Sequence, residues 1–465
     1  MNLRNPRRFF VTAAAGLTLA GALNLQAQSV DSLLDKLVDK GVLTVKEAQD
    51  LREETDKDFN KAYASKSGMP DYVTALKFNG DIRTRYEGFF GDPQYVAGGI
   101  TNTAVSRNRF RFRARFGVTA SFMDNFEAGL KLTTSEQTGG SSGNAGAFGG
   151  DPISGNTTFQ DNGSKKFIFV DQVYGKWSPL QGPDWTASLT AGKFENPFLN
   201  SDMVYDPDYT PEGGALQLGY RINDNHRLKL NTAAFVLDEF SSAHNDPFLV
   251  GGQLRWDATW SPKLSSTLGF SGYSIQNAGT LTNSVVPNIN RGNTRKSDGT
   301  PAYAFNPFVI DAALTYSLDS FPGYTGVFPV KLGGEYMENP AAPSAADSHA
   351  WNVGILFGKS GKKGTWDLSY NYKWLGANAW YEELVDSDFG AFYGSLNSPA
   401  NSGSGIGYGS GTNVKGHIVR FAYSPYDCLT LSAKWFLTDL IVPYPSLPGA
   451  NTQVHRVQVD ALFKF

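Results

Sequence analysis

The sequence predicts an all-β protein: a transmembrane, antiparallel, up-and-down β-barrel of about 16 strands, preceded by a short N-terminal periplasmic helical hairpin. Three observations carry this prediction. From about residue 74 onward, apolar and polar residues alternate in successive runs. The connections between these runs alternate between long and short. The chain also ends inside such a run, at residues 454–465, and its last residue is the aromatic Phe465.

The composition limits the class of protein. The chain has 465 residues, of which 13% are aromatic and 18% are charged. After the N-terminus no long, continuous apolar stretch occurs, so no transmembrane helix is expected there. The net charge of −3 is too close to neutral to indicate a nucleic-acid-binding protein. The single cysteine, Cys428, excludes an intramolecular disulfide.

The first part of the chain predicts export. Residues 1–27 combine a basic start, an apolar stretch and a cleavage site after Ala27, which is typical of a secretory signal peptide; an N-terminal membrane anchor is the alternative. Residues 28–70 form the expected periplasmic helical segment. Within it Thr44 and Glu47 have the spacing of a capping box at the start of a helix. The barrel is expected over residues 71–465, in the cell outer membrane.

Alternation with a period of two defines the strands. In residues 108–122, phenylalanine and other apolar residues take one face and four arginines take the other. Residues 365–375 repeat the pattern with tryptophan, tyrosine and leucine against Asp367, Asn371 and Lys373. About sixteen such runs start near residues 74, 107, 125, 167, 185, 213, 226, 248, 263, 306, 327, 349, 364, 415, 427 and 453.

The connections separate a barrel from a soluble β-sandwich, which is the alternative interpretation. Long connections, rich in Gly, Asn, Ser and Pro, alternate with tight turns such as residues 123–125 and 223–225. Transmembrane barrels have short turns on the periplasmic side and long loops outside. Because backbone groups in a bilayer must all be paired, the last strand has to pair with the first. We therefore expect Phe465 to be part of the wall and to act as an assembly signal.

Two groups of charged residues are candidates for the lining of the lumen. The basic group lies on the polar faces of the first three strands, where lipid contact would be unfavourable. Its members are Lys77, Arg83, Arg85, Arg109, Arg111, Arg113, Arg115 and Lys131. The acidic group lies in the third long connection and comprises Glu195, Asp202, Asp206, Asp208 and Glu212. If this connection folds inward, the two groups face each other across a constriction. The alternatives are an exposed acidic loop and a basic wall that only solvates the lumen.

No catalytic or metal-binding pattern stands out. The five histidines are scattered and none has the spacing of a metal site. No G-x-S-x-G motif occurs, and the Gly-rich residues 403–411 fall in a long connection. We therefore expect no catalytic residues, no metal and no cofactor, and the sequence predicts that the protein is not an enzyme.

Several stretches resemble the bacterial putative porins, a family of outer-membrane β-barrel porins. Residues 31–54 resemble the family's N-terminal helical segment, and residues 107–136 resemble its Arg-rich second hairpin. Residues 170–179, 191–198 and 206–216 are similar to the region around its constriction loop. Residues 386–390 and 411–418 are similar to its last long loop and the strand that follows. The resemblance implies a water-filled diffusion channel and a homotrimer.

Two functions remain open at this point. The first is an outer-membrane porin for the passive diffusion of small hydrophilic solutes and ions. The second is a structural or adhesive barrel, tethered to the cell wall by the N-terminal helical segment. A specific sugar channel would need aromatic side chains inside the lumen, whereas the sequence places the aromatics mainly on the outer face. The expected partners are outer-membrane lipid, further copies of the chain and the cell wall, and no nucleic acid.

Overall fold

A computed structural model describes most of the barrel region. The described residues are 51, 68–92, 94–97, 100–103, 106–136, 149–240, 244–281, 292–390, 411–442 and 451–465. The predicted signal peptide (1–27) and nearly all of the predicted helical segment (28–70) lie outside them. Among the described residues, no helix has the length and apolar character needed to cross a membrane.

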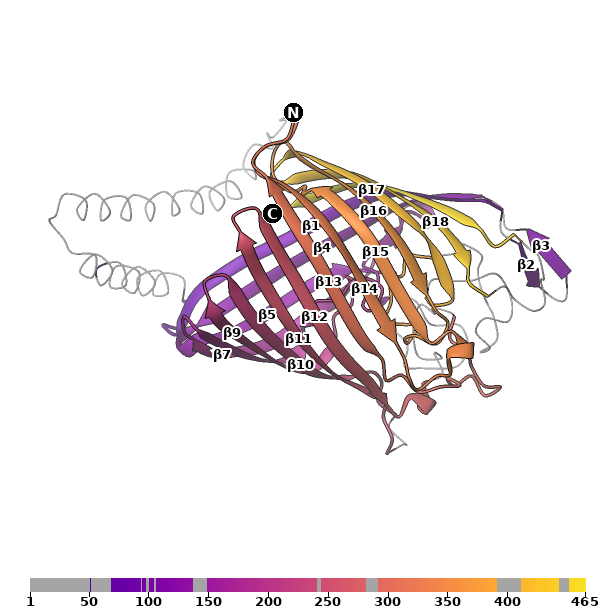
Figure 1. Ribbon diagram of the computed structural model, residues 1–465, viewed down its shortest axis with the longest axis horizontal. Helices are drawn as coiled ribbons and strands as arrows, with labels where there is room; N and C mark the ends of the chain where they lie inside the picture. Colours follow the sequence, from indigo (N-terminus) through magenta and orange to yellow (C-terminus); the bar gives the residue numbers. More distant parts are fainter. Residues whose placement is uncertain are drawn as a thin grey trace, which may run out of the picture. The chain divides into compact units, whose positions relative to one another are not determined.

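The described chain folds into one large antiparallel sheet that closes on itself (Figure 1). Of its 17 described strands, β6 is a two-residue strand that pairs with β4, and the other 16 form the wall. The wall strands are β1 (Val73–Phe90), β4 (Arg107–Phe122), β5 (Phe126–Thr134), β7 (Ile168–Gln181), β8 (Trp185–Lys193), β9 (Glu212–Asn223), β10 (His226–Val236), β11 (Phe248–Ser261), β12 (Leu264–Gln276), β13 (Phe308–Leu318), β14 (Phe328–Glu338), β15 (His349–Gly358), β16 (Thr365–Leu375), β17 (Val414–Tyr426), β18 (Leu429–Leu440) and β19 (Val454–Lys464). The predicted all-β barrel is thus confirmed, and each wall strand starts within two residues of its predicted start.

Shorter elements occupy the connections. The strands β2 (Gln94–Ala97) and β3 (Ile100–Thr103) pair with each other, and β6 spans Thr157–Thr158. Four 3-10 turns occur among the described residues: η1 (Met123–Asn125), η2 (Asp161–Gly163), η3 (Ala278–Thr280) and η4 (Ser344–Ala346). Long and short connections alternate along the chain as predicted, so every long connection leaves the same end of the barrel.

The two ends of the barrel sequence meet at a seam between β1 and β19. Their register runs from Asp81 opposite Lys464 to Phe90 opposite His455. The last residue extends this ladder by two backbone hydrogen bonds: Gly80 N–H donates to the Phe465 carbonyl at 2.9 Å, and Phe465 N–H donates to the Gly80 carbonyl at 3.1 Å. The C-terminal residue is therefore part of the wall, because the seam needs its backbone groups.

The two faces of the wall differ in character. Large apolar side chains cover the outer face, and Phe465 is 63% exposed there. Aromatic pairs such as Phe126–Trp177 and Trp185–Tyr220 join neighbouring strands on this face, with ring centroids 5.7 and 4.4 Å apart. An apolar band with aromatic side chains is the surface that a barrel presents to lipid.

A packed apolar core lies inside the barrel, between inward-facing strand residues and the long connections. Phe198 and Tyr205 come from the connection 194–211, and Trp380 comes from residues 376–390. They pack on Tyr273 of β12, with ring centroids 5.0 to 5.6 Å from its ring. The prediction that the aromatics lie mainly outside is therefore incomplete. The alternation of apolar and polar residues shows which side of a strand each residue faces, but it does not show which loops fold inward.

Candidate functional site

The four predicted basic residues of β4, Arg109 to Arg115, face the lumen, and each one meets a carboxylate. Arg109 hydrogen-bonds Glu87, and Arg111 lies 3.9 Å from the same carboxylate. Arg113 and Arg115 both bind Asp81 of β1, at 3.0 and 2.7 Å. Because β1 and β4 are neighbours in the wall, the inward-facing acids of one strand neutralise the arginines of the other.

The basic residues of β1 and β5 have different surroundings. Arg85 makes a two-pronged contact with Asp460 of β19, at 2.7 and 2.8 Å, across the seam. Arg83 donates to the Asn156 side-chain oxygen at 2.7 Å. Lys131 lies 3.5 Å from Asp171 of β7. Lys77 is exposed at the start of β1, and no ion pair involves it within the described part of the chain.

The connection 194–211 folds into the lumen and reaches the basic wall. Asp208 binds Arg113 at 2.7 Å and lies 3.4 Å from Arg115. These opposite charges are in direct contact, rather than facing each other across an open gap. Asp202, on the same connection, points toward another strand and binds Lys373 of β16 at 2.6 Å.

The other predicted acidic residues differ in their roles. Asp206 is buried and accepts hydrogen bonds from the backbone N–H groups of Asp208 and Ser387, each at 2.8 Å. Glu195 is exposed. Glu212 was predicted to belong to the loop, but this is wrong. It is the first residue of β9 and pairs with Lys193 of β8 at 3.3 Å, because the wall ladder already includes residue 212.

A second inward loop, residues 376–390, completes the site and was not predicted as part of it. It runs beside the first loop, with Asp206 N–H donating to the Leu384 carbonyl at 2.7 Å and Asp386 N–H donating to the Asp202 carbonyl at 3.0 Å. The indole of Trp380 donates to the Val204 carbonyl at 2.9 Å. The acidic residues 382–388, with no Lys or Arg among them, were the signal that could have indicated an inward loop.

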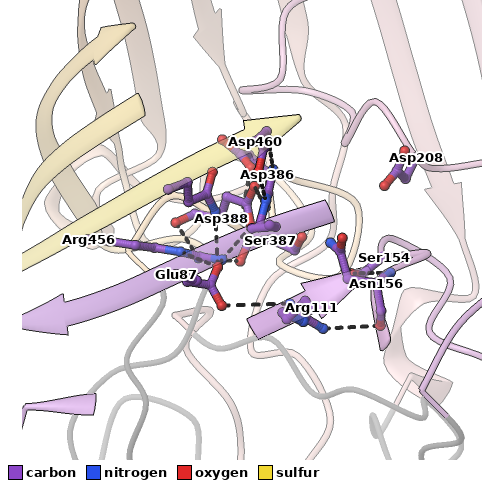
Figure 2. A network of polar contacts seen from close by, with 12 residues as sticks. Glu87, Arg111, Ser154, Asn156, Asp208, Asp386, Ser387, Asp388, Arg456 and Asp460 are labelled. Carbon is purple, nitrogen blue, oxygen red and sulfur yellow. Dashed lines mark hydrogen bonds and ion pairs between the residues drawn. The ribbon is translucent and has the colours of Figure 1, made fainter. Parts of the chain in front are cut away.

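Asp388 connects this second loop to the seam (Figure 2). The buried Arg456 of β19 binds the Asp388 carboxylate at 2.5 Å and its carbonyl at 2.7 Å. Arg456 also contacts Glu87 of β1, and Arg85 lies 3.2 Å from Asp388. Figure 2 shows Asp388, Arg456 and Glu87 close together, so the loop and both seam strands form one network, which Glu87 joins to Arg111 of the basic wall.

Two loop carboxyls have opposite electrostatic environments. Burial, with the nearby charges of Asp208 and Asp386, raises the pKa of Asp206 well above its usual range. Burial alone would also raise the pKa of Asp388, but Arg456 and Arg85 hold it well below its usual range. Asp388 is therefore a firmly ionised anchor, whereas Asp206 takes up a proton more readily than an ordinary aspartate does.

Three adjoining cavities follow the inner wall beside the two loops. The first, of about 370 Å³, lies between the basic residues and both loops. The second (about 380 Å³) and the third (about 460 Å³) continue along the inner wall between β11 and β18. Arg420 of β17 lines all three. No group of three or more His, Cys, Asp or Glu side chains that could hold a metal ion occurs among the described residues.

A closed barrel with an apolar outer face and a charged, hydrogen-bonded lumen defines a channel of the porin type. The chain matches the model of the putative porin family over residues 91–306, so the family expected from the sequence is confirmed there. This family points to a channel rather than to an enzyme, and together with the barrel it confirms the predicted location in the outer membrane.

Solved structures of outer-membrane proteins are similar to the chain at low identity. OprB of Pseudomonas putida has 11% identity over 84% of this chain and 94% of its own, with a TM-score of 0.47. The outer membrane channel DcaP of Acinetobacter baumannii has 11% identity over 84% and 97%, with a TM-score of 0.40. At such values the likeness does not define the solute of this chain. Among curated proteins, none matches the chain.

Proposed function

We propose that the protein is an outer-membrane porin that lets small hydrophilic solutes and ions diffuse passively through its lumen. The observation that carries the proposal is the run of three cavities along the inner wall, inside a closed barrel. Their lining includes arginine, lysine, aspartate, serine and asparagine side chains, which can solvate an ion or a polar solute. The outer face offers no comparable path, because it is apolar.

The predicted basic and acidic groups have a modified role in this proposal. The loops 194–211 and 376–390 narrow the lumen, and their carboxylates bind the basic wall directly. Arg85, Arg113 and Arg115 then act mainly as anchors of the loops. The space that remains for a solute runs along the three cavities. We therefore expect a smaller conductance than that of a wide, empty barrel.

Single-channel recording in a planar bilayer tests the proposal. The purified full chain should give discrete current steps in potassium chloride, whereas detergent without protein should give none. Deletion of residues 377–389 supplies a matched variant, because it removes the second loop but no wall strand. Its steps should be larger than those of the wild type. A folded, heat-resistant barrel that gives no steps in either form would contradict the porin function.

The quaternary structure and the N-terminal segment complete the proposal. We propose a homotrimer, in line with the family resemblance, and we expect its mass in detergent to be about three times that of the chain. Contact between residues 28–70 and the cell wall is a further expectation. Removal of these residues should leave the current steps unchanged and should abolish any sedimentation of the protein with purified cell wall.

A further inference from the structure

The most evident basic residues of the sequence are not the ones available to a solute. Arg85, Arg113 and Arg115 each lie 2.7 Å from at least one carboxylate oxygen. Arg109 and Arg111 share the buried Glu87. Because these charges are already balanced by neighbours, a passing anion gains little from them.

A second group of cations also lines the first cavity. It comprises Arg83 of β1, Arg420 of β17 and Lys434 of β18. Arg420 and Lys434 lie directly opposite each other in the wall, and both face the lumen. Like charges at such a position destabilise a sheet unless a counter-charge is present. Arg420 has a counter-charge, because it contacts Asp367. This contact neutralises Arg420 but not Lys434.

Arg83 and Lys434 lack an acidic partner in the part of the chain that the structure describes. No carboxylate of a described residue lies within 4.0 Å of either one. The Nε of Arg83 is buried and has no hydrogen-bond partner among the described residues. The ammonium of Lys434 lies 4.4 Å from the centroid of the Phe436 ring, a contact that offsets only a small part of a full charge.

The carboxylates that line the same cavity make their direct contacts with other cations. Asp202 and Asp386 face Lys373, and Asp388 faces Arg456. Asp208 binds Arg113, and Asp460 binds Arg85. Within ion-pair distance these carboxylates contact cations other than Arg83 and Lys434, so the charged ends of these two side chains stay available to a solute.

Neutral polar groups continue from this basic group into the next cavity. Ser201, Asn352, Ser369 and Asn371 line the second and third cavities together with Arg420. Their hydroxyl and amide groups can both donate and accept hydrogen bonds. A solute that extends from the basic group along these residues would present one anionic end and a body with several hydroxyl groups.

We propose that Arg83, Arg420 and Lys434 form a binding site for the carboxylate of small hydroxylated organic acids that pass through the lumen. The site concentrates these anions beside the two inward loops, in the first cavity. Ser369 and Asn371 hold the hydroxylated body. This inference rests on the proposed porin function and deepens it by naming the class of solute.

Gluconate and sorbitol are suitable probes, because their hydroxylated bodies are alike and only gluconate has a carboxylate. Gluconate added to one side of a bilayer should reduce the chloride current through the wild-type channel, and sorbitol should not. The double variant R83Q/K434Q should weaken this block about tenfold or more, since each lost contact is a charged hydrogen bond. Its reversal potential in a potassium chloride gradient should move toward cations.

The control is K77Q, which removes one positive charge from the inner end of β1, outside the three cavities. Gluconate should block the K77Q channel as strongly as it blocks the wild-type channel. Every variant must show the heat-resistant gel mobility of a folded barrel. The single variant K434R, which keeps the charge, should also retain the block. A folded R83Q/K434Q channel that is blocked by gluconate as strongly as the wild type overturns the binding site and leaves the porin function intact.

Calorimetric titration of the detergent-solubilised full chain separates the two proposals. Heat of gluconate binding that is lost in R83Q/K434Q supports the site even if no current is seen, in which case only the porin function fails. Absence of gluconate binding by the wild type, together with absence of block, overturns the site. Equal binding of gluconate and sorbitol overturns it as well, because the carboxylate would then have no role.

Discussion

The ammonium of Lys373 lies 2.6 Å from Asp202 and 3.5 Å from Asp386, and thereby joins two separate loops to one wall strand. The side chains of Lys373 and Asp386 are buried, whereas Asp202 is 30% exposed, so the lysine lies away from the water of the lumen and Asp202 reaches it. The two loops are also paired by backbone hydrogen bonds beside it. The position of the constriction therefore depends on a few polar contacts rather than on the barrel wall alone.

Replacement of Lys373 by methionine should loosen both loops at once. It removes the charge but keeps most of the apolar stem, and it leaves two carboxylates without their cation. The loss of one partner from a buried ion pair costs about 3–5 kcal/mol. We expect a lower unfolding temperature, measured by circular dichroism, and noisier, larger current steps. K331M is the control, because Lys331 lines the third cavity and forms no ion pair among the described residues. Equal stability of both variants would contradict the anchoring role.

Replacement of Asp208 by asparagine should shift ion preference toward anions. Asp208 neutralises Arg113 and, more weakly, Arg115, so the variant exposes uncompensated positive charge beside the first cavity. The reversal potential in a salt gradient reports the change. The shift should shrink at high salt, where the screening length falls to about 3 Å. Glu195 is exposed and takes no part in these pairs, so E195Q should leave the potential unchanged. A shift of the D208N potential toward cations would refute the charge assignment.

Two loop carboxyls, Asp206 and Asp388, should contribute to the stability of the protein with opposite pH dependence. Asp206 has a raised pKa because of burial and the charges of Asp208 and Asp386. It binds its proton more tightly in the folded protein, so its contribution falls as the pH rises above the usual aspartate range. D206N should remove this decline. Unfolding temperatures between about pH 4 and about pH 8 test the prediction.

Asp388 supplies the contrasting case. Burial raises its pKa, but Arg456 and Arg85 lower it further than burial raises it. Its contribution is therefore present above the usual aspartate range and is lost only as the pH falls through the lowered pKa. D388N should destabilise the protein throughout the neutral range. If D206N and D388N had the same pH profile, the opposite environments of the two carboxyls would be wrong.

Deletion of Phe465 should impair assembly more than conduction. The deletion removes both backbone hydrogen bonds to Gly80 at the seam and an exposed aromatic side chain. The amount of heat-resistant barrel in outer-membrane fractions should fall, whereas the channels that do assemble should keep the wild-type step size. F465Y keeps the backbone and the aromatic ring and serves as control. Wild-type levels of the truncated chain would show that the last residue is not needed.

The sequence predicted the wall in detail because alternation reports directly which side of a strand a residue faces. Arg113 and Phe112 were placed on opposite faces, as the structure has them. The same pattern also places Asp81 and Glu87 on the inner face, beside Arg83 and Arg85. The prediction considered the basic residues of this face without these acids, and so it expected an open basic wall where the structure has ion pairs.

The path of the loops could not be predicted in this way. Trp380 and Val204 meet through a hydrogen bond between connections that are separated by eight wall strands. No local pattern encodes such a contact, because it depends on the diameter and closure of the barrel. The acidic character of residues 382–388 indicates a loop that binds cationic side chains. It does not indicate that Arg456 and Lys373 are those side chains.

The seam has a consequence for the order of folding. Arg85 and Asp460 are 375 positions apart in the chain, and Glu87 and Arg456 are 369 apart. Until β19 docks on β1, Asp460 and Arg456 lack these partners, and Arg85 and Glu87 lie on an open strand edge. Contacts with such long separation form slowly, since a long segment must be ordered first. Closure of the sheet and neutralisation of its charges are then one late event. We expect a chain that lacks its final strand to insert poorly into the membrane, because the backbone groups at the edge of β1 would have no partner.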